Sequence, residues 1–151
     1  QEINQPIAKA CYKNKAEHLH NVPAPVFPVD TKNLEACITF CIEVLGLKLL
    51  PRPKALDQFG PGAWLADSDD TIQFHLIAND GALKPSEDAK VEPAGRHTAW
   101  RITDVAAFRE RMRALDVPFQ EIAGLIGDAQ LFVTDPQGHT WEFQGPSGSG
   151  S

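Results

Sequence analysis

Hydrophobic positions along the chain predict the same order of elements twice, a helix followed by three short strands. The first helix is expected to begin after Asp30 or Thr31, both of which can cap a helix, and to end at Gly46. Its apolar positions recur at helical spacing: Leu34, Ile38, Cys41 and Leu45. Three strand-like runs follow, separated by turns rich in Pro, Gly or Asp: 47–51, 63–66 and 71–77.

The second half repeats this order. Asp104 is expected to cap a helix whose apolar face carries Val105, Phe108, Met112 and Leu115. Strands are predicted on either side of it: 97–103, 119–122, 129–133 and 140–144. A strand at 18–29 precedes the first helix, and its three prolines favour an edge position because they lack the backbone donor. Each half therefore reads β-α-β-β-β.

This pattern predicts an α+β fold built from two tandem βαβββ modules. The expected division of the chain has five parts: an N-terminal extension at 1–17, a first module at 18–78, a linker at 79–95, a second module at 96–144, and a linker or tag remnant at 145–151.

The repeat also aligns two side chains that can bind metals. His75 and Glu142 fall at equivalent places, shortly after the paired Asp67 and Asp135. If Glu142 lies on a buried strand face, an unpaired carboxylate there would cost several kcal/mol. It therefore needs a cation, a proton or hydrogen-bond donors.

Composition narrows the class of protein. The 151 residues are 42% hydrophobic and 23% charged, which suits one domain or two small fused halves. The net charge of -6, without a basic cluster interleaved with aromatics, argues against a nucleic-acid partner. No apolar run approaches the roughly 18 to 20 residues that span a bilayer, so we expect no membrane partner and a cytoplasmic location. Cys37 and Cys41 share the apolar face of the first helix and are expected to be buried.

Several segments together resemble the vicinal oxygen chelate superfamily, which includes glyoxalase I, extradiol dioxygenases, fosfomycin-resistance enzymes and bleomycin-binding proteins. The segments are Glu43–Leu49, Gly62–Leu65, Phe74–Ile77, Arg96–Arg101 and Asp135–Phe143. The resemblance covers roughly residues 18 to 144 and is nearest to glyoxalase-like members. It implies sheets that curl around a shared cavity, a homodimer, and a divalent metal held by strands of both modules.

The metal positions implied by the resemblance match His75, His97 and Glu142. Two imidazoles and one carboxylate suit one divalent ion per site, Fe, Mn, Ni, Co or Zn, without choosing among them. The superfamily's fourth metal-ligand position, on the first strand, is matched less well by this sequence. His20 is the expected fourth ligand, with Asn21 or water as alternatives, because neighbouring strand residues point to opposite faces.

Residues two apart on a strand share a face, which adds candidates for substrate contacts. Gln73 should accompany His75, and Arg101 should accompany His97. Arg101 can hold an anionic or carbonyl group of a substrate, or pair with Glu142 when metal is absent.

Two functions remain open from the sequence. In one, the protein is a glyoxalase-like metalloenzyme of lyase, isomerase or dioxygenase type that binds a small substrate through two neighbouring oxygens. Glu142 is its expected catalytic residue and moves a proton. In the other, it is a metal-free protein of the bleomycin-resistance type that sequesters a small molecule.

Overall fold

The computed structural model describes residues 23–80, 82, 93, 95–123 and 128–146, and it contains two four-stranded sheets. The elements of the first module are β1 (Val26–Val29), the short 3-10 helix η1 (Thr31–Asn33), α2 (Leu34–Glu43), β2 (Lys48–Leu50), the 3-10 helix η2 (Lys54–Phe59), β3 (Gly62–Ala66) and β4 (Gln73–Ala78). Their sheet has the order β1-β4-β3-β2, with β1 parallel to β4 and the other pairs antiparallel.

The second module has the same topology. It contains β5 (His97–Arg101), α3 (Val105–Ala114), β6 (Gln120–Ala123), β7 (Asp128–Thr134) and β8 (Thr140–Pro146). Its sheet has the order β5-β8-β7-β6, again with the first strand parallel to the last. The prediction of an α+β fold with two tandem βαβββ modules is confirmed, and neither sheet closes on itself.

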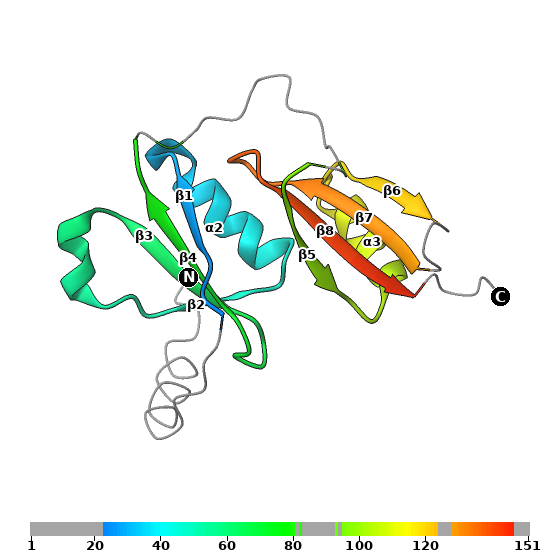
Figure 1. Ribbon diagram of the computed structural model, residues 1–151, viewed down its shortest axis with the longest axis horizontal. Helices are drawn as coiled ribbons and strands as arrows, with labels where there is room; N and C mark the ends of the chain where they lie inside the picture. The colour runs from blue at the N-terminus through cyan, green and yellow to red at the C-terminus, as the bar shows by residue number, and fades with distance from the viewer. Residues whose placement is uncertain (1–22, 81, 83–92, 94, 124–127, 147–151) are drawn as a thin grey trace.

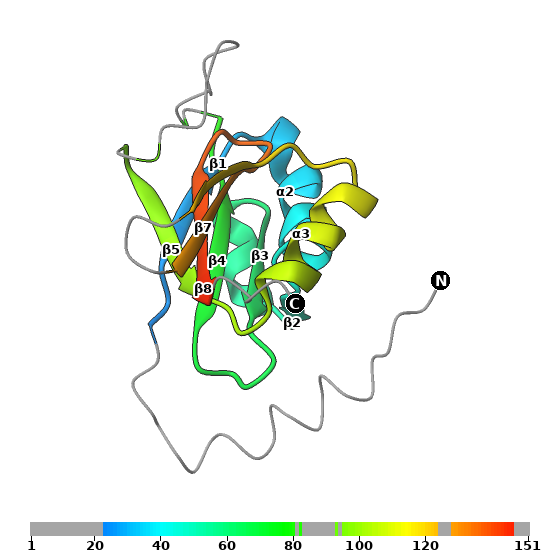
Figure 2. The same ribbon diagram turned by 90° about the vertical axis from the view of Figure 1, so that its right-hand side faces the viewer.

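The helices α2 and α3 lie on the same side of the two sheets, as Figure 2 shows, and no helix of the described residues covers the opposite sheet faces. The core lies between sheets and helices, where Leu65, Phe74, Met112, Leu131 and Trp141 are at most 1% exposed. Side chains of the same strands that point away from the helices therefore form an open face. Figure 1 looks onto this open face.

The predicted helix caps are present. The Asp104 carboxylate accepts a hydrogen bond from the Ala107 amide at 2.8 Å, which satisfies one free N–H group at the start of α3. Asp30 accepts from the Lys32 amide at 3.0 Å and so caps η1, which leads directly into α2. Gly46 ends this region at φ 69°, a conformation that favours glycine. The 3-10 helix η2 was not predicted, because its sequence has no helical apolar period.

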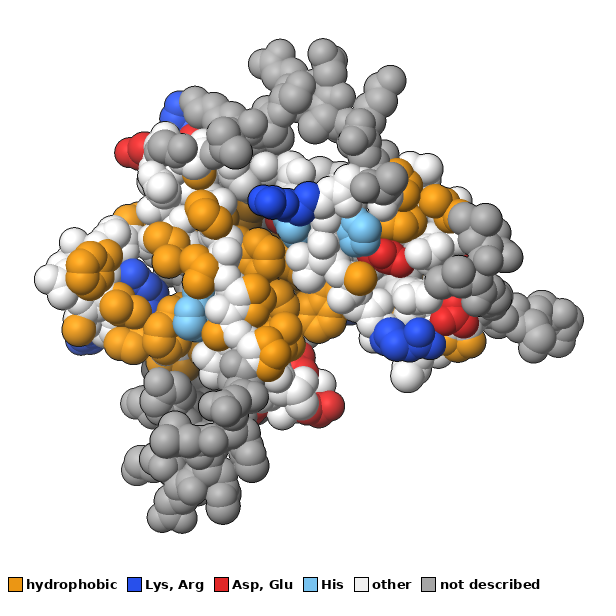
Figure 3. Space-filling view, viewed as in Figure 1, with side chains coloured by type: hydrophobic (Ala, Val, Ile, Leu, Met, Phe, Trp, Pro, Cys, Tyr) orange, Lys and Arg blue, Asp and Glu red, His pale blue; other side chains and the backbone are white. Residues whose placement is uncertain are grey.

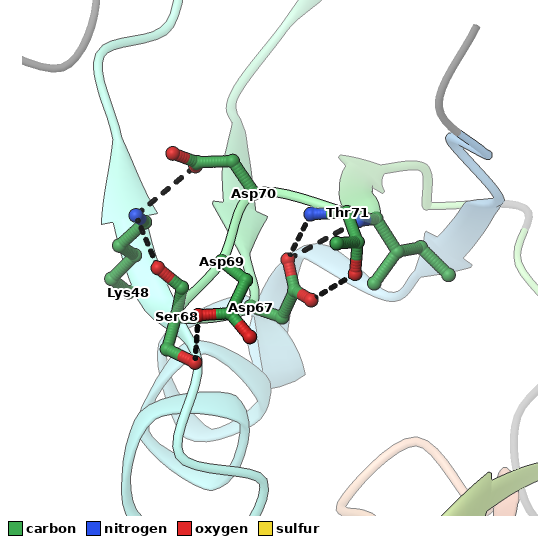
Figure 4. A network of polar contacts seen from close by, with 7 residues as sticks. Lys48, Asp67, Ser68, Asp69, Asp70 and Thr71 are labelled. Carbon is green, nitrogen blue, oxygen red and sulfur yellow. Dashed lines mark hydrogen bonds and ion pairs between the residues drawn. The ribbon is translucent and has the colours of Figure 1, made fainter. Parts of the chain in front are cut away.

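The two aspartates aligned by the repeat have the same structural role. Asp67 Oδ1 accepts from the amides of Thr71 at 2.6 Å and Ile72 at 3.1 Å, and its other oxygen accepts from the Thr71 hydroxyl (Figure 4). Asp135 Oδ1 accepts from the amides of Gln137 and His139, both at 2.9 Å. Each carboxylate thus fixes the turn into the last strand of its module, β4 or β8, and with it the register of His75 or Glu142.

The β7–β8 turn also joins the modules. Gln137 Oε1 accepts from the Asp30 amide at 2.8 Å and from Asn33 Nδ2 at 3.1 Å. Phe27 of β1 contacts His139 and Trp141, with ring centroids 5.2 and 5.3 Å apart. One continuous core therefore spans both modules, and the first strand of module one lies against the last turn of module two.

Cys37 and Cys41 are buried and free, as predicted from their helical spacing. Burial raises the pKa of both thiols to about 12, so neither is a nucleophile at neutral pH. Within the described residues, no helix is long and apolar enough to cross a membrane.

Candidate metal centre

Glu142 occupies the middle of β8 and is only 6% exposed. Its neighbours Trp141 and Phe143 point toward the helix side, where the Phe143 ring lies 4.1 Å from that of Phe108. Glu142 therefore points to the open face, beside its register partners Ala99 and Phe132. The carboxylate is placed there by strand alternation alone.

Two side chains contact this buried carboxylate. Gln130 of β7 donates from Nε2 to Glu142 Oε1 at 2.6 Å, and His97 Nε2 lies 2.9 Å from Glu142 Oε2. A buried charge needs such partners, because its desolvation is otherwise not compensated. The need of a buried Glu142 for a cation, a proton or donors was predictable from the sequence, whereas the role of Gln130 was not.

The position of the His97 protons constrains what this contact can be. Nδ1 lies 2.8 Å from the Gly95 carbonyl oxygen. Because a carbonyl oxygen only accepts, Nδ1 carries a hydrogen. In the neutral imidazole, Nε2 then presents a lone pair to the lone pairs of Glu142 Oε2. The 2.9 Å contact is favourable only when a proton or a metal cation lies between these two atoms.

The geometry fits two ligands of one metal ion. Ligand atoms about 2.1 Å from a metal and at right angles to each other lie about 3.0 Å apart, close to the observed 2.9 Å. The outer contacts also fit, because metal-bound histidines commonly donate their other N–H to a carbonyl and ligating carboxylates are themselves hydrogen-bonded. Gly95 and Gln130 supply these two contacts.

His75 lies on the open face of the other sheet. It is the register partner of Trp64 on β3 and of Val26 on β1. Its Nε2 is buried and has no hydrogen-bond partner among the described residues. Burial lowers the pKa of the imidazole, which keeps the ring neutral at pH 7. A neutral imidazole with an unpaired nitrogen is a competent metal ligand.

The structure does not bring His75 to His97 and Glu142. In the described part of the chain, no three His, Cys, Asp or Glu side chains gather in a way that could hold a metal ion. His97 and Glu142 form a two-residue half of a site on the second sheet, and His75 stands apart on the first.

Strand register identifies the first-strand position that corresponds to His97. In the second sheet, Ala99 faces Glu142 and His97 lies two residues earlier. In the first sheet, Val26 faces His75, and the ladder continues upstream because the Gln73 amide donates to the Pro23 carbonyl at 2.9 Å. Ala24 therefore takes the place of His97, and alanine cannot ligate. The predicted ligand His20 and the alternative Asn21 lie outside the described residues.

The two predicted substrate contacts have different surroundings. Gln73 is partly buried on the open face, two residues from His75. The Arg101 side chain is 71% exposed and donates to Asp128 Oδ2 at 3.1 Å, so its ion pair is with Asp128 and not with Glu142. His97 takes the place beside Glu142 that was considered for Arg101.

Sequence and structure comparisons place the chain among known proteins. The profile of the Glyoxalase/Bleomycin resistance protein/Dioxygenase superfamily matches residues 27–143. The chain belongs to this superfamily. The resemblance to vicinal oxygen chelate proteins is thereby confirmed at the level of the family. None of the curated proteins matches the sequence.

Solved structures of the superfamily share the fold. A glyoxalase/dioxygenase from Nostoc punctiforme has a TM-score of 0.65 at 18% identity, covering 85% of this chain and 92% of that one. A mutant of the fosfomycin resistance protein FosX from Listeria monocytogenes, complexed with Mn(II) and dihydroxypropylphosphonic acid, has a TM-score of 0.61 at 14% identity, with coverage of 85% and 93%. The antibiotic binding protein TnmS3 from Streptomyces sp. CB03234 has a TM-score of 0.62 at 20% identity, with coverage of 86% and 98%.

Proposed function

We propose that this protein is a glyoxalase-like metalloenzyme in which His97 and Glu142 hold one divalent metal ion. The observation that carries the proposal is the 2.9 Å contact between His97 Nε2 and Glu142 Oε2, two atoms that need a cation or a proton between them. The FosX structure supports it, because that superfamily member is complexed with Mn(II).

The ion would be Fe, Mn, Ni, Co or Zn, because imidazole and carboxylate ligands suit all of these. When bound, it would polarise two neighbouring oxygens of a small substrate, as lyases, isomerases and dioxygenases of this type require. Gln130 holds one oxygen of Glu142, so the other is aimed at His97. Glu142 Oε2 is also the atom of this chain that would accept or return a proton, in a step in which it is not bound to the ion.

We further propose that a second copy of the chain completes the site in a homodimer. Val26 and Ile77, which flank His75 on the open face of the first sheet, are 51% and 41% exposed. Figure 3 shows hydrophobic side chains gathered over this sheet. A partner that covers this face would bury apolar area and could bring His75 of one copy to His97 and Glu142 of the other.

Elemental analysis tests the metal. Protein purified without added metal or chelator should contain about one metal ion per chain, and the ion should be one of these five elements. The Glu142→Gln variant should lose this ion. Glu121→Gln is the matched control, because Glu121 is exposed and pairs with Arg109. A protein that neither contains nor takes up metal would overturn the proposal.

Mixing variants tests the shared site. His75→Ala and Glu142→Ala each damage every site in their own homodimer, whereas a mixed dimer has one intact site if ligands come from both chains. We expect the mixture to regain about a quarter of the wild-type metal content after refolding together, as random pairing predicts. No regain would show that each chain forms its own site.

A metal-free binding function is the second candidate, and one observation favours it. Ala24 takes the first-strand place that corresponds to His97, and the described residues offer no third ligand nearby. In this alternative a proton lies between His97 and Glu142, and the open face binds a small molecule. The antibiotic binding protein TnmS3, which has the same fold, supports a binding function. Absence of metal in the analysis above would support it.

A further inference from the structure

A groove of about 640 Å³ lies between the modules, and it is distinct from the open face that carries His97 and Glu142. Its walls come from the end of α2, the β3–β4 turn and the β5–α3 segment, so both modules contribute to it. A volume of this size is within the roughly 300 to 1,000 Å³ of small-molecule sites.

The groove's lining is mixed, and its apolar part comes from both modules. Val44 and Leu45 at the end of α2 contribute aliphatic surface, while Phe108 and Phe143 contribute two aromatic rings whose centroids are 4.1 Å apart. Trp100 also lines it. These side chains offer a surface for the aromatic or aliphatic body of a ligand, beside the polar part of the groove.

Arg111 supplies a positive charge to this groove. Of the arginines in the described residues, Arg52, Arg101, Arg109 and Arg113 pair with carboxylates. Arg111 lines the groove, and no ion pair links it to another described residue. Its guanidinium can therefore receive an anionic group.

Gly46 makes room for this guanidinium across the module boundary. A Cβ placed on Gly46 would come to 3.3 Å from Arg111 Nη1, which is closer than most real contacts of this kind. The missing side chain therefore lets Arg111 of α3 reach over the end of α2, at the margin of the groove. Arg111 is exposed at this margin, so its guanidinium is accessible to a ligand in the groove.

Two carboxylates limit the ligand's charge. Asp69 and Asp104 also line the groove. Asp104 is occupied in capping α3, and Asp69 bonds to the Ser68 hydroxyl at 3.3 Å in the turn shown in Figure 4. These two carboxylates would repel a second negative charge on a ligand, so a doubly charged group such as a phosphate is disfavoured.

We propose that this groove binds a small amphipathic monoanion, with a carboxylate on Arg111 and an apolar body against Phe108 and Phe143. The site is independent of the metal centre, and its test does not depend on the proposed function. It gives the protein a second ligand site on the helix side of the sheets.

The test compares two probes with the same phenylpropyl body, 4-phenylbutyrate with an anionic carboxylate and 4-phenyl-1-butanol with a neutral hydroxymethyl group. Binding is followed by the amide resonances of Gly46 and Thr103 at the groove, with Ile77 and Glu142 reporting on the open face. We expect shifts at the groove amides and an affinity for the carboxylate about fivefold or more above that for the alcohol, a ratio typical of one added charge-assisted hydrogen bond.

Variants assign the difference to one side chain. Arg111→Gln should bring the two affinities within about twofold, and Arg111→Lys should keep part of the preference because it keeps the charge. Arg113→Gln is the control, since Arg113 is exposed and pairs with Glu110 on the same helix. Equal affinities in the wild type, a preference that survives Arg111→Gln, shifts confined to the open face, or no binding below about 10 mM would overturn the proposal.

Discussion

The Trp64 ring lies flat against the His75 ring, with 4.4 Å between the ring centroids and 9° between the ring planes. The two residues are register partners on β3 and β4, so the sheet itself sets this contact. Trp64 covers one face of the imidazole, and burial lowers the pKa of His75 because it disfavours the charged ring.

Replacing Trp64 by Leu should raise the pKa of His75 toward its ordinary value, because water would then reach the exposed ring face. An NMR titration of the imidazole resonances measures this change. The His139 resonances in the same spectra are the control, because His139 lies against Phe27 and Trp141 instead. An unchanged His75 titration would show that the stack is not what excludes water.

Acid should destabilise the fold before the carboxylates titrate. Burial lowers the pKa of both His75 and His139 below the ordinary value. Between the lowered pKa values and about 6.5, the unfolded chain binds more protons than the folded chain. The free energy of unfolding should therefore fall as the pH falls from about 7 toward these lowered values.

Urea unfolding at several pH values measures this dependence. A double variant, His75→Gln with His139→Gln, removes both groups and should show a flatter profile over the same pH range. An equally steep profile in the double variant would assign the pH dependence to other groups.

Gln130→Leu should weaken the metal centre without removing a ligand. Its amide donates to Glu142 Oε1 at 2.6 Å, and loss of such an outer contact typically costs about 10- to 100-fold in metal affinity. The unfolding free energy should also fall by about 1 to 3 kcal/mol, because a buried carboxylate oxygen loses its donor. Metal titration and urea unfolding measure the two effects.

Gln58→Leu is the control for this change, because Gln58 is exposed and donates to the carbonyl of the nearby Ala55 at 2.9 Å. Equal metal affinities for Gln130→Leu and Gln58→Leu would show that Gln130 does not orient Glu142.

Gln137→Ala should loosen the junction between the modules. Gln137 Oε1 accepts from the amide of Asp30, a residue only 5% exposed, and from Asn33 Nδ2. Leaving a buried amide without an acceptor costs about 1 to 3 kcal/mol, and urea unfolding should show a loss of that size. A loss no larger than that of Gln58→Ala would mean that the contact does not hold the modules together.

The repeat in the sequence predicted most of the fold, because each module carries its own capping aspartate, helical period and alternating strands. Asp104 and Gly46 act as expected at helix ends. The alignment of Asp67 with Asp135 was informative for a physical reason, since both carboxylates close the turn before the last strand. Most strand ends shifted by one or two residues, where hydrogen bonding and not side-chain pattern decides. The strand predicted at 18–29 is larger than β1, Val26–Val29, within the described residues, because residues 23–25 are not strand, and α2 ends at Glu43, before the predicted Gly46.

The site was only partly predictable. Alternation places His97 and Glu142 on one face, but their contact depends on the parallel register of β5 with β8, which the sequence does not encode locally. Gln130 comes from a third strand, β7. The sequence showed only that it alternates with the apolar Leu131, which does not indicate a contact with Glu142. The separation of His75 from this pair follows from the packing of the modules, and periodicity carries no information about that packing.

The most direct test of the metal centre is an anomalous difference map from crystals of the protein soaked with Mn(II). We predict a peak about 2.1 to 2.3 Å from both His97 Nε2 and Glu142 Oε2, with Gln130 still bonded to the other carboxylate oxygen. A map without a peak at these atoms, in crystals where His97 and Glu142 remain in direct contact, would contradict the account and favour the metal-free pair.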